Sequence, residues 1–433
     1  MRPLTDARPV DAFRCPRPIL LLGLLLGALL GPLGCGDDGP PAKPPTPAGS
    51  RTNSGVSGDP KPKFETDAEV RAEAKRRIFA EVDAMQRELD PFGLRVDPWS
   101  LAHALLATDS ELRRASLTRD LVTWISTSNG ARVPLHSEKL PRGEQHPHLV
   151  WKALEEVSLE RGTPLDAPLA ELSATARHSF LFPSDFRQWN DVAWFLHALS
   201  SQTRRDAGAP LALGTDPGAP DAPTPASLAR AALGWVESAD RVVEEALAAE
   251  GLFERPSGNA PFAEAGIYAT TCGGQHLLQA VLAARAAGFL TGEEDARIAR
   301  RVEVLIARLD AEDHFRRREE ERALAAGHSK TRASRFRVLT SLKLHGHACE
   351  TLAAALPLFP PGSEFRPRVR EALEKAIERT VSLLRTDLTV LDPQGTIALR
   401  LREKEPSMWE LWFGDTCHAL HGLRLAENAL AGE

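Results

Sequence analysis

The chain has 433 residues, of which 42% are hydrophobic and 26% are charged, and its formal net charge is −6. This composition is typical of a globular protein, and the acidic balance argues against nucleic acid as a partner. The length allows two or three domains.

Residues 1–34 have the pattern of an export signal. Four arginines precede an apolar run, ILLLGLLLGALLGPLG, that ends directly before Cys35. A basic start, a short apolar stretch and small residues before a cut are typical of a signal peptide, and the run is too short to span a bilayer. Leu33-Gly34-Cys35 resembles a bacterial lipobox. The resemblance implies that Cys35 carries lipid and anchors the protein to a membrane of the cell envelope, with the body on the periplasmic or extracellular side; the alternative is a secreted protein cut nearby.

Residues 35–63 are rich in Gly, Pro, Ser, Asp and Thr, which predicts a flexible tether between the membrane and a folded body. Beyond the tether the chain has three cysteines, Cys272, Cys349 and Cys417. An odd number in an oxidising compartment leaves at least one thiol unpaired. Buried inert thiols and metal ligands are both open readings of these residues.

Residues 64–205 are expected to form helices only. Apolar residues follow helical spacing in 67–89, and Asp97-Pro98 is a helix start that leads into a helix carrying His103. Further helices are expected over 111–125, 145–160 and 174–201, the last carrying Trp194 and His197. Residues 206–224 are rich in Gly, Pro, Ala and Asp and are expected to be a surface linker between two halves.

Residues 225–433 read as three pairs of helices joined by loops. A charged amphipathic helix is followed by an apolar one in each pair, at 225–250 with 267–288, 294–313 with 336–356, and 365–386 with 408–428. Only 388–390 and 396–401 are weak strand candidates. The sequence therefore predicts an all-α protein.

The apolar helices of these pairs share one pattern. Segments TTCGGQHLLQAVLAA, SLKLHGHACETLAAA and FGDTCHALHGLRLAE place His276, His347 and His418 71 residues apart. Three residues beyond each histidine stand Gln279, Glu350 and His421 in turn. Because positions i and i+3 share a helix face, each helix is expected to show a polar stripe of two residues.

Apolar helices of this form, alternating with polar outer helices in about six pairs, resemble an α/α toroid. The openings TCGGQH, HGHACE and GDTCHALHGL are similar to inner helices of the protein prenyltransferase β-subunit and terpenoid cyclase superfamily. The resemblance implies a lumen that holds the chemistry. Asp415-Thr416-Cys417 resembles the Asp-x-Cys of prenyltransferase β-subunits, which implies zinc bound by Asp415 and Cys417 with His347 or His103. A second resemblance, to lanthionine synthetase cyclase-like toroids, implies zinc bound by Cys272 and Cys417-His418.

Helix geometry limits which of these groups can cooperate. At about 100° per residue, Cys272 and Asp415 share the face of the repeated histidines, whereas Cys349 points away. In a tight ring of helices three histidines converge on one ion, and in a slack ring only neighbouring helices do. The expected catalytic residues are His276, His347, Glu350, His418 and Asp415. The expected ligands of a zinc-type ion with an open position are His347, Asp415, Cys417, His418 and Cys272.

Several readings of function remain open. Lys330, Arg332, Arg335 and Arg337 stand before the helix of His347, where they attract an anionic ligand to the mouth of a lumen or belong to a solvated loop. No nucleophile elbow, P-loop, dinucleotide fingerprint or HExxH helix is present in the sequence. The hypotheses are a metal-assisted enzyme, a non-catalytic binding or scaffold module whose polar residues only hydrogen-bond one another, and a polysaccharide-processing α/α barrel.

Overall fold

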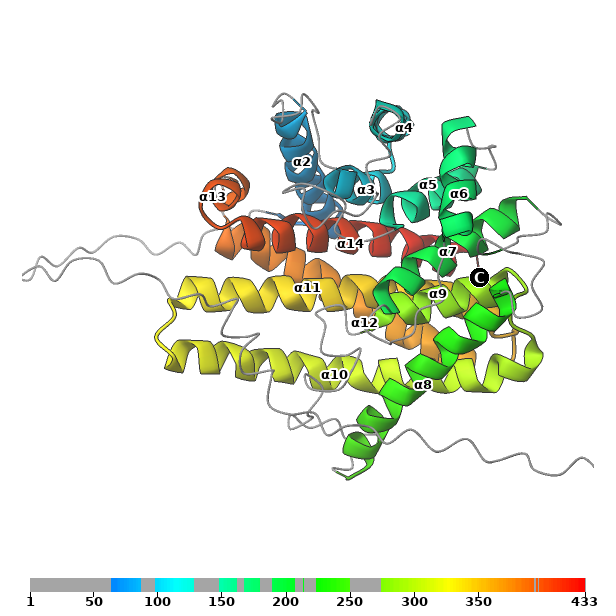
Figure 1. Ribbon diagram of the computed structural model, residues 1–433. Helices are drawn as coiled ribbons and strands as arrows, with labels where there is room; N and C mark the ends of the chain where they lie inside the picture. Colours follow the sequence, from blue (N-terminus) through cyan, green and yellow to red (C-terminus); the bar gives the residue numbers. More distant parts are fainter. Residues whose placement is uncertain are drawn as a thin grey trace, which may run out of the picture. The chain divides into compact units, whose positions relative to one another are not determined.

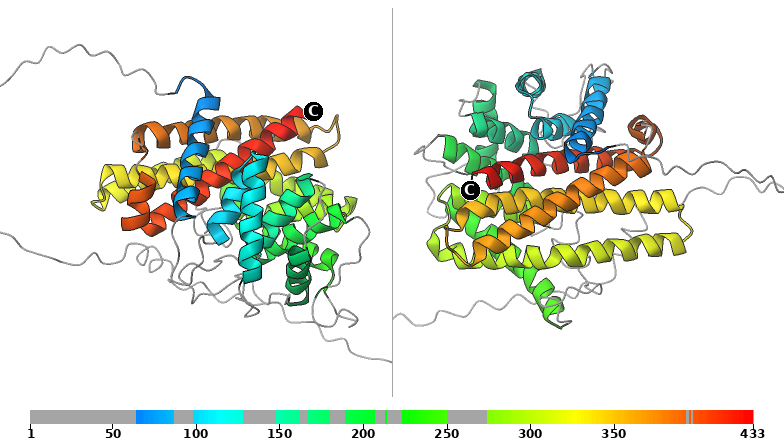
Figure 2. Two further views of the ribbon diagram at one scale, coloured as in Figure 1. Left: turned by 90° about the horizontal axis from the view of Figure 1, so that it is seen from above. Right: turned by 180° about the vertical axis from the view of Figure 1, so that it is seen from behind.

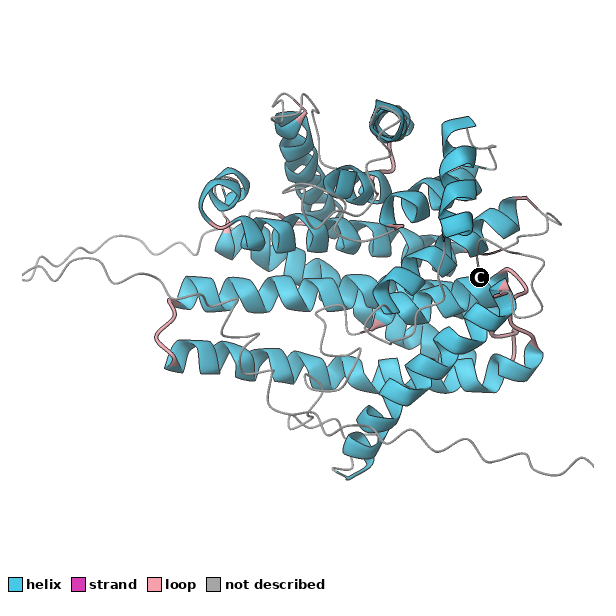
Figure 3. Cartoon of the chain, in the orientation of Figure 1, coloured by secondary structure: helices cyan, strands magenta, loops and turns pink. Residues whose placement is uncertain are grey.

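The computed structural model describes residues 64–86, 98–127, 148–161, 167–179, 189–206, 213, 223–249, 274–392, 395 and 397–432. Lys61–Glu433 form one compact unit. Every regular element among the described residues is helical (Figure 3), so the all-α prediction is confirmed. The expected signal segment and tether lie outside these residues, as does most of the expected linker 206–224.

Thirteen α-helices are described (Figure 1): α2 (Asp67–Met85), α3 (Pro98–Ala107), α4 (Glu111–Thr127), α5 (Leu149–Arg161), α6 (Ala167–Ser179), α7 (Trp189–Arg205), α8 (Pro225–Ala249), α9 (Gln275–Ala286), α10 (Asp295–Ala325), α11 (Lys330–Ala355), α12 (Phe365–Thr386), α13 (Ile397–Lys404) and α14 (Pro406–Ala431). Short turns of 3-10 or π type are η4 (Gly292–Glu294), η5 (Leu356–Leu358) and η6 (Asp387–Leu391).

Local signals explain several helix starts. At α2 the Thr66 hydroxyl accepts from the Glu69 N–H and the Glu69 carboxylate accepts from the Thr66 N–H, which is a capping box. Ser329 caps α11 by accepting from the Arg332 N–H. Pro406 is the first residue of α14, where its missing N–H costs no helical hydrogen bond.

Six helices form a closed sequence of packing contacts, in which each helix packs on the next and the last packs on the first. α3 packs on α5, α5 on α7, α7 on α9, α9 on α11, α11 on α14, and α14 on α3. The other α-helices each pack on a member of this sequence: α2 and α4 on α3, α6 on α5, α8 on α9, α10 and α12 on α11, and α13 on α14. Figure 1 shows α10 running antiparallel beside α11, and the rear view in Figure 2 shows α12 crossing α11.

Burial separates the two groups of helices. In α3, which belongs to the closed sequence, every residue except Trp99 is buried. In α12 only one face is buried, and Val369, Leu373 and Ala376 follow its helical spacing. None of the described helices combines the length and the apolar character that crossing a bilayer requires.

Three expectations about local structure were wrong. Residues 388–390 lie in η6 and 397–401 in α13, so neither is a strand; the buried Asp387 accepts from the Trp412 indole N–H, and this tertiary contact outweighs a short β pattern. Most of the expected loop after residue 313 is helical, because α10 continues to Ala325 and α11 begins at Lys330, and ion pairs such as Arg337–Glu320 link the two helices. The single helix 174–201 is two helices, α6 and α7.

Candidate metal centre

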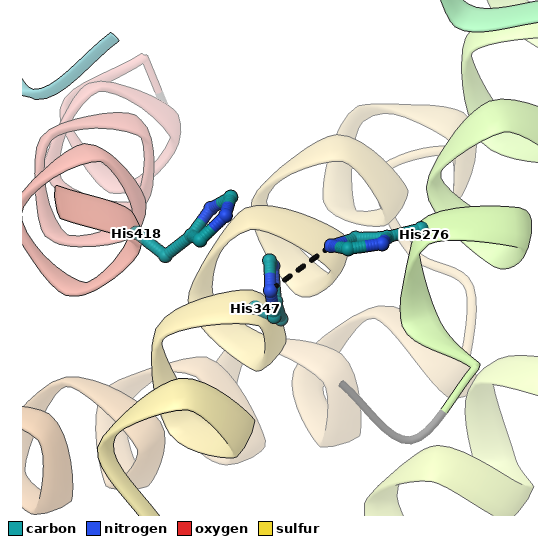
Figure 4. Close-up of side chains that lie close together, drawn as sticks. All are labelled: His276, His347 and His418. Atoms are coloured by element: carbon teal, nitrogen blue, oxygen red, sulfur yellow. Dashed lines mark hydrogen bonds between the residues drawn. The ribbon is translucent and has the colours of Figure 1, made fainter. Parts of the chain in front are cut away.

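Three histidines meet where α9, α11 and α14 pack together (Figure 4). The Nε2 atoms of His276 and His347 are 3.0 Å apart, and the ring centroids of His347 and His418 are 4.0 Å apart. One nitrogen of each ring lies within 4.8 Å of the others. All three side chains are buried. The structure therefore brings the repeated histidines into one cluster, which we call the histidine centre.

Two glycines allow the close approach of α11 and α14. A Cβ on Gly346 would lie 2.9 Å from the Cα of Ala419, which is closer than real Cβ contacts come. A Cβ on Gly422 would collide with the carbonyl oxygen of Gly346. Because both positions lack side chains, the backbones next to His347 and His418 pack in direct contact and their rings reach each other.

Glu350 organises the histidine centre from one side. Its carboxylate accepts from Nδ1–H of His347 at 2.9 Å, His418 at 3.1 Å and His421 at 3.0 Å, and from the amide of Gln279 at 2.9 Å. A carboxylate only accepts, so each imidazole carries its proton on Nδ1. The Nε2 atoms of neutral His347 and His418 consequently present lone pairs, which is the state that carboxylates impose on metal-binding histidines.

The three imidazoles of the centre are neutral near pH 7. Burial lowers the pKa of His276 and His418 well below the ordinary value, and the neighbouring His347 lowers both further. Burial also lowers the pKa of His347, against the opposing effect of Glu350. Burial by itself would raise the pKa of Glu350, but the imidazoles of His347 and His418 hold it well below its usual range. Neutral imidazoles beside a carboxylate are ready to ligate a metal.

His421 has a different state from the histidine centre. Its Nδ1 faces Glu350, and its Nε2 lies 2.9 Å from Oε1 of Glu156. Burial would lower its pKa, but the two carboxylates raise it above the ordinary value. Each nitrogen faces a carboxylate, so neither is directed at the histidine centre. Glu156, Glu160 and His421 are close enough to hold an ion, yet Lys152 lies 2.5 Å from Glu156. These charges already balance without a metal.

Side chains from the first half of the chain close around the centre. The ring of Trp194, on α7, has its centroid 4.2 Å from that of His276. On α3, His103 lies with its centroid 4.9 Å from that of His418 and donates from Nδ1–H to the carbonyl oxygen of Trp99. His103 thus has the same tautomer as His347 and His418, although it lies outside the three-histidine group.

The other expected ligands are not brought into this group. Asp415 is buried on α14 with Oδ1 3.5 Å from Nζ of Lys343, and neither Asp415 nor Cys417 joins a potential metal group among the described residues. Burial raises the pKa of the Cys417 thiol well above its usual value. Cys272 and Cys35 lie outside the described residues. Cys349 packs towards α12, with Sγ 3.6 Å from Oγ1 of Thr380, as its helical position predicts.

The basic segment before His347 lies far from the centre. Arg337 pairs with Glu320, and Arg335 donates to the carbonyl oxygen of Leu391. Arg337 stands ten residues before His347 on α11, which corresponds to about 15 Å along the helix. This segment braces the α10–α11 hairpin.

A cavity of about 450 Å³ opens on another side of α11, between α10 and α12. Its lining includes His345 and Arg379, but none of the residues of the histidine centre. His345 is two residues before His347, so the two side chains point in roughly opposite directions from the helix. The cavity is separate from the centre.

Sequence reasoning missed Lys343, Lys152 and Glu156. Lys343 had a usable signal, because it stands four residues before His347 and so shares its face. Lys152 and Glu156 lie on α5, whose sequence gives no hint that this face meets His421.

The three imidazoles suit a tetrahedral transition metal. Two nitrogens bound to one zinc ion at about 2.0 Å lie about 3.3 Å apart. The Nε2 atoms of His276 and His347 lie 3.0 Å apart, and one nitrogen of each of the three rings lies within 4.8 Å of the others, so the separations are close to those that a shared ion requires. Imidazole suits zinc, copper, iron and nickel, and three protein ligands leave one position open.

In comparisons with family models, with curated proteins and with solved structures, this chain matches none.

Proposed function

We propose that this protein binds a zinc-type ion through Nε2 of His276, His347 and His418, and that the open fourth position serves a reaction or binds a ligand. The observation that carries the proposal is the hydrogen bonding of Glu350, which directs the Nε2 lone pairs of His347 and His418 into the shared space. The Nε2 atoms of His276 and His347 form a hydrogen bond of 3.0 Å, and a bound ion would take the place of the proton between them.

We propose further that the helices form an α/α toroid similar to those of the protein prenyltransferase β-subunit and terpenoid cyclase superfamily. The closed packing sequence from α3 to α14 and back to α3 supports this arrangement. In such a ring the histidine centre would lie in the lumen. A bound ion would polarise an oxygen or activate water there. The chain's own contribution would be to orient the imidazoles through Glu350 and to exclude water with Trp194.

A second candidate is a non-catalytic ion that ties α9, α11 and α14 together in a binding or scaffold module. The observation that favours it is burial, since His276, His347 and His418 are only 7%, 0% and 5% exposed. A structural ion has a closed set of four protein ligands, and a catalytic one exchanges its fourth ligand with solvent. Exchange of that ligand therefore separates the two candidates.

We also propose that this protein is located in the cell envelope and is anchored to a membrane by lipid on Cys35. The support is the arginine-led apolar run and the Leu-Gly-Cys that ends it. Mass spectrometry of the mature N-terminus is expected to find a diacylated cysteine at position 35, and a Cys35→Ala variant is expected to leave the membrane fraction. An unmodified N-terminus elsewhere would remove the anchor from the account.

Metal analysis of the purified full chain tests the proposed ion. We expect about one zinc per chain, and loss of that ion when His347→Ala and His418→Ala are combined. His328→Ala, in the turn between α10 and α11, is the matched control and should keep the metal. A metal-free protein whose unfolding temperature ignores added zinc would contradict the proposal.

A further inference from the structure

Lys343 lies beside the histidine centre on the side opposite Glu350. It stands four residues before His347 on α11, and Glu350 stands three residues after it, so all three share one face of the helix. The positive charge of Lys343 acts on His276 and His347, adding to the effect of burial that lowers the pKa of both imidazoles. The ammonium group therefore lies within electrostatic reach of the proposed ion.

The partner of Lys343 leaves the ammonium only partly engaged. Its Nζ is 3.5 Å from Oδ1 of Asp415, whereas a charge-assisted N–H···O bond is about 2.7–2.9 Å long. The Lys343 side chain is 22% exposed and that of Asp415 only 1%. Burial raises the pKa of Asp415 to about 7, and Lys343 offsets part of that effect.

The two sides of the histidine centre also differ in how their polar atoms are satisfied. Glu350 accepts from three imidazoles and one amide. Asp415 shares a helix face with His418, and its Oδ2 is buried with no hydrogen-bond partner among the described residues. A buried acceptor without a partner is energetically unfavourable, so a ligand that donates a hydrogen bond to this atom would be favoured.

We propose that the open position of the ion takes a small carboxylate-bearing ligand whose charge is bound by Lys343 and whose neighbouring hydroxyl donates to Oδ2 of Asp415. The inference rests on the proposed metal function and names the ligand class that the same site would accept. Lys343 supplies the positive charge. Asp415 pairs with Lys343 through Oδ1 and accepts the hydrogen bond from the ligand's hydroxyl through Oδ2. The smallest ligand with both features is glycolate, and acetate lacks the hydroxyl.

The test uses full-length protein loaded with cobalt(II), whose visible spectrum reports both ligation by imidazole and entry of a further ligand. Acetate and glycolate are titrated into the wild-type protein, and glycolate is expected to bind about tenfold more tightly because its hydroxyl satisfies a buried acceptor. Lys343→Gln is expected to weaken both ligands about tenfold while the cobalt content stays the same. Lys343→Met must show the same loss, and Lys343→Arg is expected to restore most of it.

Asp415→Ala separates recognition of the hydroxyl from binding of the charge, since it should bring the ratio of glycolate affinity to acetate affinity close to one. Lys375→Gln, an exposed lysine on α12, is the matched control and should change neither affinity. A protein without an imidazole–cobalt spectrum would overturn the proposed metal function itself. A normal spectrum with acetate affinity unchanged in Lys343→Gln, or a glycolate preference unchanged in Asp415→Ala, would overturn this inference alone.

Discussion

Two buried polar clusters in this protein can be compared directly, the histidine centre and an ionic cluster between α8 and α10. In the ionic cluster Arg301 donates to Asp240 at 2.9 Å, and Arg308 donates to Glu312. Each buried carboxylate there lies beside a guanidinium and accepts hydrogen bonds from its N–H groups. In the histidine centre the facing groups are imidazoles, and two of them, His347 and His418, donate from Nδ1 to Glu350. The Nε2 atoms of His276 and His347 share one hydrogen bond. Burial is similar in both clusters, so the distinguishing feature is that the histidine centre brings together nitrogen atoms that can ligate a metal.

The largest expected effect falls on the ionic cluster. Glu312→Ala removes the carboxylate that accepts from Arg308, which is 1% exposed, and breaking a buried pair in this way costs about 3–5 kcal/mol of unfolding free energy. Urea unfolding of wild type and variant measures the loss. Metal content is expected to stay unchanged, because the cluster is scaffold.

The control for that change is Glu374→Ala on α12, whose partner Arg370 is as exposed as itself. It should leave the unfolding midpoint almost unchanged, since exposed ion pairs contribute little. If Glu312→Ala removed the metal, or behaved like Glu374→Ala, the distinction between the two clusters would fail.

A smaller effect is expected where α11 and α14 touch. Gly346→Ala places a Cβ against the backbone of Ala419, so we expect a loss of about 1–3 kcal/mol and weaker metal binding as His347 and His418 separate. Gly234→Ala in α8 meets nothing within 4 Å and should stabilise the helix by up to about 1 kcal/mol with metal binding intact. Zinc titration of both variants, followed by thermal unfolding, makes the comparison; equal zinc affinities would show that the helix contact does not set the site.

At neutral pH the smallest effect concerns a histidine outside the centre. Burial, with help from Lys152, lowers the pKa of His197 to about 4. The unfolded chain binds a proton at this histidine near pH 6.5, whereas the folded chain binds it only near pH 4. The contribution of neutral His197 to the free energy of unfolding is therefore complete above pH 6.5 and is lost as the pH falls towards 4.

His197→Gln removes this contribution. Wild type should lose up to about 1.4 kcal/mol per pH unit more than the variant over that window. Unfolding free energies measured between pH 7 and pH 4 would give parallel curves if His197 were protonated in the folded state.

The all-α fold follows from sequence periodicity, and helical spacing fixes which face each repeated histidine occupies. Convergence of the three histidines depends on how closely the helices pack, which spacing left open and the contact at Gly346 and Gly422 decides. The ligand set could not be read in the same way. Asp415 shares the face of His418, so its spacing predicts a ligand. In the structure it forms an ion pair with Lys343 instead, and this pairing depends on how α11 packs against α14, which the sequence does not show. The role of Glu350 was equally hidden, since residue spacing shows that it is near His347 but not that it also accepts from His418 and His421.

X-ray absorption at the zinc edge of stoichiometrically loaded protein shows directly which atoms bind the ion. We expect three imidazole nitrogens and one oxygen atom as ligands at about 2.0 Å from the zinc, and no sulfur ligand. A sulfur shell near 2.3 Å would assign the ion to cysteine, with Cys417 or Cys272 in the site, and would contradict a centre built from His276, His347 and His418.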